Sequence, residues 1–191
     1  MKRVFVAIDV SDEARRRVSA YSETLRREFP HLRAGWEKAE KLHLTLKFLG
    51  DANEGQLNNL SETVGKIAGQ ISTFKLEIGG TGVFPSPRNA RVLWLGVKDE
   101  KGSLLKMSEI LEGESAKIGF RPETRNFKAH LTVARLREPN NAVEIARKHL
   151  QNEFEPVEFE VSEIVIYESK LQSTGSIYSI VSKYELNLTE R

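Results

Sequence analysis

Residues 43–49 read His-Leu-Thr-Leu-Lys-Phe-Leu, and residues 130–136 read His-Leu-Thr-Val-Ala-Arg-Leu. The two stretches share a His-x-Thr-x pattern and a leucine six residues after the histidine, and they stand 87 residues apart. Apolar and polar residues alternate in the first stretch, which predicts a β-strand with one wet face. Because two such motifs at one repeat distance need a common cause, the sequence predicts a duplicated unit.

The rest of the chain repeats one succession of elements around each motif. Apolar residues at spacings of three and four indicate helices, and alternating or continuous apolar runs indicate strands. Strands are expected over 2–10, 42–48, 74–78, 91–97, 128–136, 157–161, 164–167 and 176–188, and helices over 14–29, 57–67, 103–118 and 142–150. Each half thus reads strand, helix, strand, helix, strand. Residues 1–191 are expected to form one domain of two pseudo-symmetric lobes.

Composition narrows the class of protein. Lys and Arg number 29 and Asp and Glu 27, a net charge of +2, which excludes a polybasic chain whose partner follows from charge alone. The absence of cysteine excludes disulfides, thiolate metal sites and a cysteine nucleophile. Apolar runs are far shorter than the roughly 20 residues of a membrane span, and the N-terminus does not resemble a signal peptide. We therefore expect a cytoplasmic protein that does not enter membranes.

The two motifs suit acid–base chemistry at phosphorus. Residues i and i+2 of a strand share a face, so His43, Thr45 and Lys47 are expected on one face, and His130 with Thr132 on another. If the lobes face each other, two imidazoles and two hydroxyls converge. One histidine can then act as base and the other as acid near neutral pH, while the threonine hydroxyls bind oxygens of a tetrahedral anion.

Other readings of these residues stay open at this point. Each histidine could be a hydrogen-bonded strand residue, or a metal ligand, although no Asp, Glu or third His lies close to either motif on its wet face. His31 and His149 are expected at the surface, and Gly79–Gly82 is expected to form a turn. Basic residues that bracket the second motif suit a phosphorylated substrate: Arg121, Arg125, Lys128, Arg135 and Arg137. Phe5 and Phe84 are either core residues or stacking candidates.

The chain resembles the two-histidine (2H) phosphoesterases, and among them the RNA 2′,3′-cyclic phosphodiesterases, also called 2′-5′ RNA ligases. Five segments carry the resemblance: 3–9, 43–50, 82–85, 91–94 and 127–135. One departure is Ala129, where the family often has proline before the second histidine; it should affect local stiffness rather than chemistry.

The resemblance implies a bilobal α+β fold, a pseudo-twofold duplication whose antiparallel sheets line a central cleft with helices outside. It implies hydrolysis of terminal 2′,3′-cyclic phosphates to 2′-phosphates without metal or nucleotide cofactor. Carried to this sequence, His43 is the proton donor and His130 the proton acceptor. Thr45, Thr132 and Arg135 would bind the phosphate, and Phe5 would stack on the terminal base.

The expected partner is RNA with a 2′,3′-cyclic phosphate end, such as a tRNA half, bound by a monomer. ATP-independent 2′-5′ ligation is related chemistry that the same residues could serve. The alternatives are a module that captures RNA ends or nucleotide phosphates without important turnover, and a 2H enzyme acting on a small cyclic phosphate.

Overall fold

The computed structural model describes residues 1–138, 142–172 and 175–188. Its strands form two sheets in which every pairing is antiparallel. The four-stranded sheet has the order β3 (His43–Ala52), β1 (Lys2–Asp9), β8 (Glu163–Gln172), β9 (Gly175–Glu185). The five-stranded sheet has the order β2 (Ala34–Trp36), β6 (His130–Leu136), β5 (Val92–Lys98), β4 (Phe74–Phe84), β7 (Val157–Val161).

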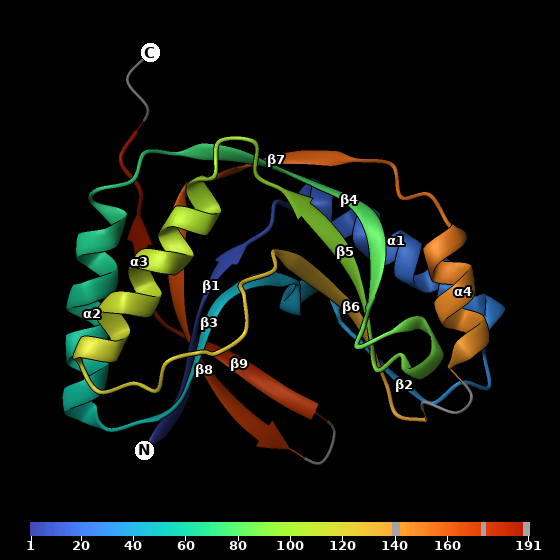
Figure 1. Cartoon of the computed structure of the whole chain (residues 1–191), viewed down its shortest axis with the longest axis horizontal. Coiled ribbons are helices and arrows are strands. Elements are labelled where there is room, and N and C mark those ends of the chain that lie inside the picture. The colour runs from blue at the N-terminus through green and yellow to red at the C-terminus, as the bar shows by residue number, and fades with distance from the viewer. Residues whose placement is uncertain (139–141, 173–174, 189–191) are drawn as a thin grey trace.

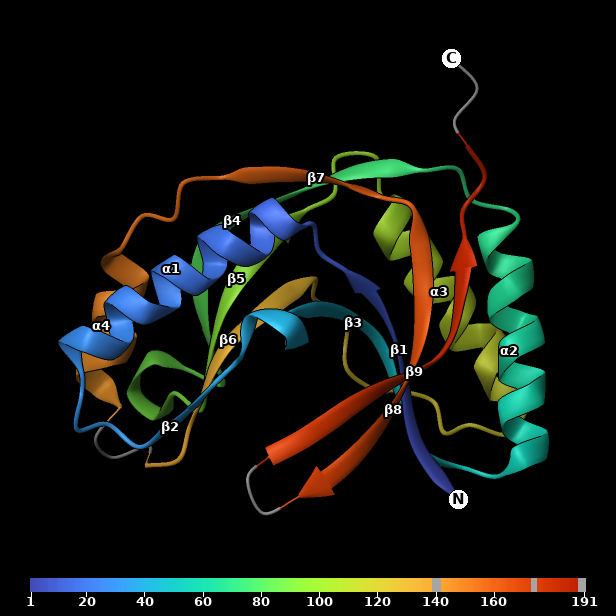
Figure 2. The ribbon, with the colours of Figure 1, turned by 180° about the vertical axis from the view of Figure 1, so that it is seen from behind.

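The helices lie on the outer faces of the two sheets, as Figures 1 and 2 show. Helices α2 (Glu54–Ala68) and α3 (Ser103–Lys117) cover the four-stranded sheet, and α1 (Asp12–Glu28) and α4 (Val143–Gln151) cover the five-stranded one. Two short 3₁₀ turns, η1 (Ala39–Lys41) and η2 (Pro87–Asn89), complete the elements of the described residues. The α+β class with antiparallel sheets and outer helices is thus confirmed.

Local sequence explains where the first two helices begin. The Ser11 hydroxyl accepts a hydrogen bond from the Ala14 amide at 3.2 Å, which satisfies one of the free N–H groups at the start of α1. At α2, Asn53 and Gln56 form a reciprocal capping box. None of the helices in the described residues is long and apolar enough to cross a membrane.

Each sheet combines strands from both halves of the chain. Strand β4, from the first half, pairs with β5 and β7, whereas β8, from the second half, pairs with β1. The helices cross in the same way, since α1 packs near β6 and β7, and α3 packs near β3. The order of the elements was predicted correctly except for the short strand β2, which was missed. The exchange was not predicted, and it makes each lobe depend on the whole chain.

Several strand ends differ from the sequence prediction, and two of the differences involve glycines. Strand β8 extends to Gln172, and β9 ends at Glu185. Strand β3 continues through Gly50, which has a φ of +77°, to Ala52. Strand β4 continues through Gly79–Gly82 to Phe84, so the turn expected there is wrong. The pairing with β5 shifts register between Gly79 and Thr81, and Gly80 has a φ of +69°, so these glycines form an irregularity inside a strand.

The two histidines outside the motifs differ in environment. His31 is exposed, as predicted. His149 was expected at the surface, but it is fully buried beneath the five-stranded sheet. Its ring is hydrogen-bonded to the Tyr21 hydroxyl and to the carbonyls of Gly82 and Trp94. A buried polar ring requires such partners, and here they come from three other elements.

Candidate active site

The two motif strands meet where the two sheets approach each other. Strand β3 forms the edge of the four-stranded sheet, and it contacts β6 of the five-stranded sheet. Figures 1 and 2 show the two strands side by side near the centre of the molecule. His43 begins β3 and His130 begins β6, so the fold brings together motifs that are 87 residues apart in the sequence.

The His43 ring is fixed by its own strand. Its Nδ1 lies 2.6 Å from the carbonyl oxygen of Lys41, and its Nε2 lies 3.1 Å from Oγ1 of Thr45. Since a carbonyl can only accept, Nδ1 carries a proton, and Nε2 of the neutral ring accepts from the threonine hydroxyl. The Tyr178 ring meets the imidazole edge-on, with centroids 5.4 Å apart.

His130 is held in the same way. Its Nδ1 lies 2.7 Å from the carbonyl oxygen of Lys128, again two residues before the histidine. The aromatic neighbours here are Phe84, edge-on at 5.0 Å, and Trp94 at 6.1 Å. The Lys128 ammonium lies over the Trp94 ring at 4.4 Å from its centroid. Both histidines therefore direct Nε2 away from their carbonyl partners.

Electrostatics distinguish the two imidazoles. Burial is the main cause that lowers the pKa of each ring, and each carbonyl partner raises it. The Asp9 carboxylate also raises the pKa of His43, whereas the cations of Arg135 and Lys128 lower that of His130. Arg135 and Arg15 lower the pKa of His43 as well, so the charge of Arg135 acts on both rings.

Both motif strands contain a bulge at equivalent positions. The β1–β3 register shifts where Val6 faces Lys47 and Ala7 faces Thr45, which leaves Leu46 without an opposite residue. The β5–β6 register shifts where Leu93 faces Ala134 and Trp94 faces Thr132, which leaves Val133 without one. Leu46 and Val133 are again 87 residues apart. A bulge reverses the alternation of faces beyond it.

The first bulge places Lys47 on the face opposite to the predicted one. Its side chain turns away from His43 and Thr45 and is only 3% exposed. There it forms an ion pair with Glu112 of α3, and its ammonium also donates to the Arg121 carbonyl at 3.3 Å. Phe48 takes the place beside the site, since it faces Phe5 across the ladder and their ring centroids are 5.3 Å apart.

The second bulge places Arg135 on the face of the motif. Arg135 pairs with Val92 across the ladder, beyond the shift, and its side chain is 57% exposed. Its Nε lies 3.5 Å from a carboxylate oxygen of Glu37. Burial raises the pKa of Glu37, and the charge of Arg135 lowers it. The guanidinium is therefore anchored on one side and open to solvent on the other.

Phe5 does not have the place expected of a base-stacking residue. It is 0% exposed, because Tyr167 stacks on it at 5.2 Å and Tyr178 covers it edge-on at 5.1 Å. Its centroid lies 4.9 Å from that of His43. Phe5 thus packs against the His43 ring and has no exposed surface on which a base could stack. Phe84, the other stacking candidate, is half-buried against His130.

Sequence reasoning missed the residues that approach the motifs from other strands. Tyr167 donates a hydrogen bond from its hydroxyl to the Asp9 carboxylate at 2.7 Å, and an Arg15 nitrogen lies 3.6 Å from the same oxygen. Asp9 itself pairs directly with His43 in the β1–β3 ladder. The only sequence signal was the position of Asp9 at the end of a strand, which gives no partner.

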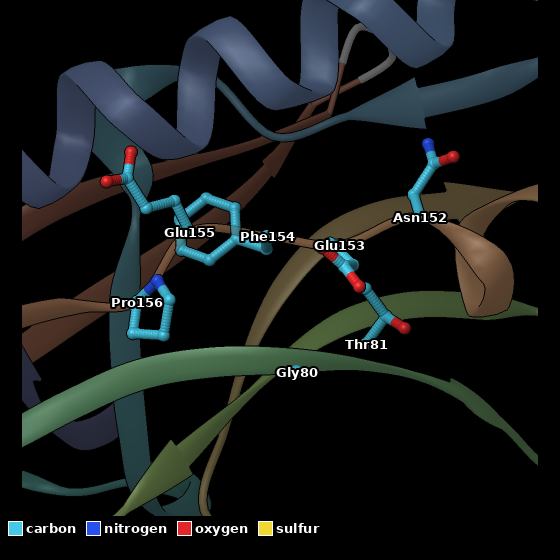
Figure 3. Close-up of a pocket in the computed structure, with 7 residues that line it drawn as sticks. All are labelled: Gly80, Thr81, Asn152, Glu153, Phe154, Glu155 and Pro156. Carbon is cyan, nitrogen blue, oxygen red and sulfur yellow. The ribbon is translucent and has the colours of Figure 1, made fainter.

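A separate pocket lies away from both motifs. Figure 3 shows it between β4 and the segment that follows α4, lined by Gly80, Thr81, Asn152, Glu153, Phe154, Glu155 and Pro156. Its lining contains two carboxylates and no cation, which does not suit a phosphate. In the described part of the chain, no group of three or more His, Asp or Glu side chains is arranged to hold a metal ion.

Comparisons with known proteins agree with this geometry. A family model described as LigT like phosphoesterase matches residues 8–94 and again 95–178. The chain is 36% identical over 187 residues to an RNA 2′,3′-cyclic phosphodiesterase of Methanothermobacter thermautotrophicus, which covers 96% of this chain and 98% of that protein. A protein of the same name from Archaeoglobus fulgidus is 36% identical over 184 residues, 96% of this chain and 99% of that protein.

Solved structures show the same likeness. Escherichia coli LigT complexed with 3′-AMP has a TM-score of 0.79 to this chain at 27% identity, over 97% of this chain and 98% of that one. The similarity extends over nearly the full length of both chains.

Proposed function

The chain belongs to the family of LigT-like phosphoesterases, and from this premise we propose that it hydrolyses a 2′,3′-cyclic phosphate at the end of an RNA to a 2′-phosphomonoester. One observation carries the proposal: two imidazoles in one site, each with Nδ1 held by a carbonyl oxygen, at 2.6 and 2.7 Å. That arrangement leaves the lone pair of each Nε2 for proton transfer, although Nε2 of His43 first has to give up its hydrogen bond from Thr45. The curated relatives that bear the name RNA 2′,3′-cyclic phosphodiesterase support the substrate class.

The reaction is an in-line displacement at phosphorus. Nε2 of His130 takes a proton from water as the water oxygen attacks the phosphorus atom. The bond from phosphorus to O3′ breaks, and Nε2–H of a protonated His43 supplies the proton to O3′. The product carries a 2′-phosphate and a 3′-hydroxyl. His130 then releases a proton to solvent and His43 takes one up, which restores both rings.

The surroundings of the rings support this division of roles. The acid must hold a proton before the reaction. Burial lowers the pKa of His43, and the charges of Arg135 and Arg15 lower it as well, whereas the Asp9 carboxylate favours the protonated form. The base must start neutral, and the cations of Lys128 and Arg135 disfavour the protonated form of His130. Two like groups are thereby given different tasks by their neighbours.

Thr45, Thr132 and Arg135 would bind the non-bridging oxygens of the phosphate. Thr45 already touches Nε2 of His43 at 3.1 Å, and Thr132 occupies the equivalent place on β6. Arg135 would supply a charge-assisted contact that strengthens as negative charge develops on the phosphoryl oxygens.

The enzyme would act as a monomer, because both motifs and all the groups named here come from one chain. RNA ends in the cytoplasm, tRNA halves among them, would be its substrates.

The test is to incubate the protein, with excess EDTA, with a short RNA that ends in a 2′,3′-cyclic phosphate, and to identify the product end. The proposal requires a 2′-phosphate product that His43→Ala and His130→Ala no longer form, while His31→Ala, an exposed histidine, forms it normally. Tight binding without turnover would replace hydrolysis by capture of RNA ends. Turnover that needs added metal would overturn the two-histidine mechanism.

A further inference from the structure

Phe48 is a large apolar residue at the surface, with 56% of its area open to solvent. We infer that Phe48 is a platform for a nucleobase of the bound RNA, namely the base of the nucleotide that precedes the cyclic phosphate end. The inference rests on the proposed function, and it adds a second contact that extends beyond the reacting phosphate. It therefore specifies the substrate as a strand of at least two nucleotides.

The pair of bulges supplies the first argument. Phe48 and Arg135 each stand five residues after the motif histidine and two after the bulged residue, and the two are 87 residues apart. Both bulges turn this position onto the face of the histidine, and both residues are exposed. The fold thus presents two equivalent positions to the substrate, one cationic and one aromatic.

Continuity with the site supplies the second argument. The His43 ring packs against Phe5 at 4.9 Å, and Phe5 packs against Phe48 at 5.3 Å. Phe48 therefore lies two ring contacts from the imidazole, with the buried Phe5 ring between them. A terminal nucleoside would occupy the space over His43 and Phe5. The next base of the strand would then lie at Phe48.

Charge on the same face supplies the third argument. Arg3 precedes Phe5 by two residues on β1, so both side chains lie on the face that carries His43, and Arg3 is exposed. Its charge reaches Tyr178, a neighbour of His43. Arg3 pairs with Asp51 across the ladder, and the next pair on the same face is Phe5 with Phe48. A guanidinium on the same face as an exposed aromatic ring suits a single strand, since the cation contacts a phosphodiester while the ring stacks on a base.

The test compares three substrates that share one reacting end. These are adenosine 2′,3′-cyclic phosphate, the dinucleotide ApA with the same cyclic end, and that dinucleotide with an abasic first sugar. For Phe48→Ala we expect KM for the intact dinucleotide to rise about tenfold, because base–aromatic stacking is lost. KM for the other two substrates should stay at its wild-type value. Phe48→Trp, which keeps a ring, should retain the preference for the intact dinucleotide.

Leu105→Ala is the matched control, because Leu105 is a similarly exposed apolar residue on the outer helix α3, and it should change none of the three values. An equal change for all three substrates in Phe48→Ala, or no change for any, would overturn the subsite. Binding of the corresponding 2′-phosphate products separates this inference from the proposed function. A wild-type protein that hydrolyses nothing, yet binds the dinucleotide in a way that depends on Phe48, would overturn hydrolysis and support the platform.

Discussion

Asp9 lies directly opposite His43 in the ladder between β1 and β3. Its carboxylate accepts a hydrogen bond from the Tyr167 hydroxyl at 2.7 Å, and Arg15 lies 3.6 Å away. Burial lowers the pKa of His43, and Asp9 partly opposes this effect. His130 has no such carboxylate among the groups that shift its pKa. The two halves of the site thus differ in charge although their backbone geometry is alike.

Asp9→Asn should therefore move one limb of the pH–rate profile. An acid is active only while protonated, so activity falls as pH rises through the pKa of His43 and as pH falls through that of His130. Without the carboxylate the pKa of His43 drops, and the alkaline limb of kcat/KM should shift to lower pH while the acid limb stays. A shift of the acid limb instead would mean that His43 is the base and His130 the acid.

Loss of either motif histidine should remove most of the activity. We expect His43→Ala and His130→Ala each to lower kcat by about 10²–10⁴, the range for a general acid or base. Single-turnover rates with the cyclic-end RNA give the measurement. A variant that keeps near-full turnover would exclude that histidine from the mechanism.

The motif threonines should matter less than the histidines. Thr45→Ala and Thr132→Ala should each lower kcat by about 10–10³, by analogy with the loss of one oxyanion donor. Thr24→Ala is a suitable control, because Thr24 is exposed on α1 and its hydroxyl donates to the Ala20 carbonyl of its own helix. Equal rates in Thr45→Ala and wild type would assign the phosphate contacts to other donors.

The sequence predicted those parts of the site that follow from the regular alternation of faces along a strand. His43 with Thr45, and His130 with Thr132, follow from the two-residue repeat of a strand, since both residues precede the bulge. Beyond the bulge the same rule fails: Lys47 was placed on the wrong face. A bulge is defined by the opposite strand, β1 or β5, which the motif itself does not contain.

Contacts between distant strands also lay beyond sequence reasoning. Tyr178 of strand β9, which is far from Phe5 in the sequence, helps to bury the Phe5 ring. The duplication at an offset of 87 residues stays a prediction, and the paired bulges and the two family-model matches support it.

The buried ion pair between Lys47 and Glu112 should be important for stability. The Lys47 side chain is almost fully buried, and Glu112 also accepts a hydrogen bond from the Glu123 amide at 2.9 Å. Glu112→Ala leaves a buried ammonium without its carboxylate, which should lower the free energy of unfolding by about 3–5 kcal/mol. Lys47→Met should cost less, because it removes the buried charge and keeps the apolar stem.

Urea unfolding of the two variants measures the difference. Glu13→Ala is the matched control, since it breaks an exposed pair with Arg17 and should cost under about 1 kcal/mol. A loss in Lys47→Met as large as that in Glu112→Ala would show that packing, and not the unpaired charge, sets the cost.

His149 should make stability depend on pH. Its Nε2–H donates to the carbonyls of Gly82 and Trp94, at 3.1 and 3.0 Å, and its Nδ1 accepts from the Tyr21 hydroxyl at 2.7 Å. Burial is the main cause that lowers the pKa of this ring in the folded protein. Below about pH 6.5, the ordinary value for histidine, the unfolded chain binds a proton that the folded chain does not. The stability from the neutral ring is complete above that pH and is lost as pH falls toward the folded pKa.

His149→Gln keeps an N–H donor and cannot titrate, so its stability should fall less steeply between pH 7 and pH 5. One proton accounts for at most about 1.4 kcal/mol per pH unit. Urea unfolding at several pH values measures the slope, and His31→Gln, at an exposed site, should keep the wild-type slope. His43 and His130 are present in both variants, so their contributions cancel in the comparison. A slope in His149→Gln equal to that of wild type would mean that the buried ring does gain its proton in the folded state. That proton would be on Nδ1, and the Tyr21 hydroxyl would have to turn and accept from it.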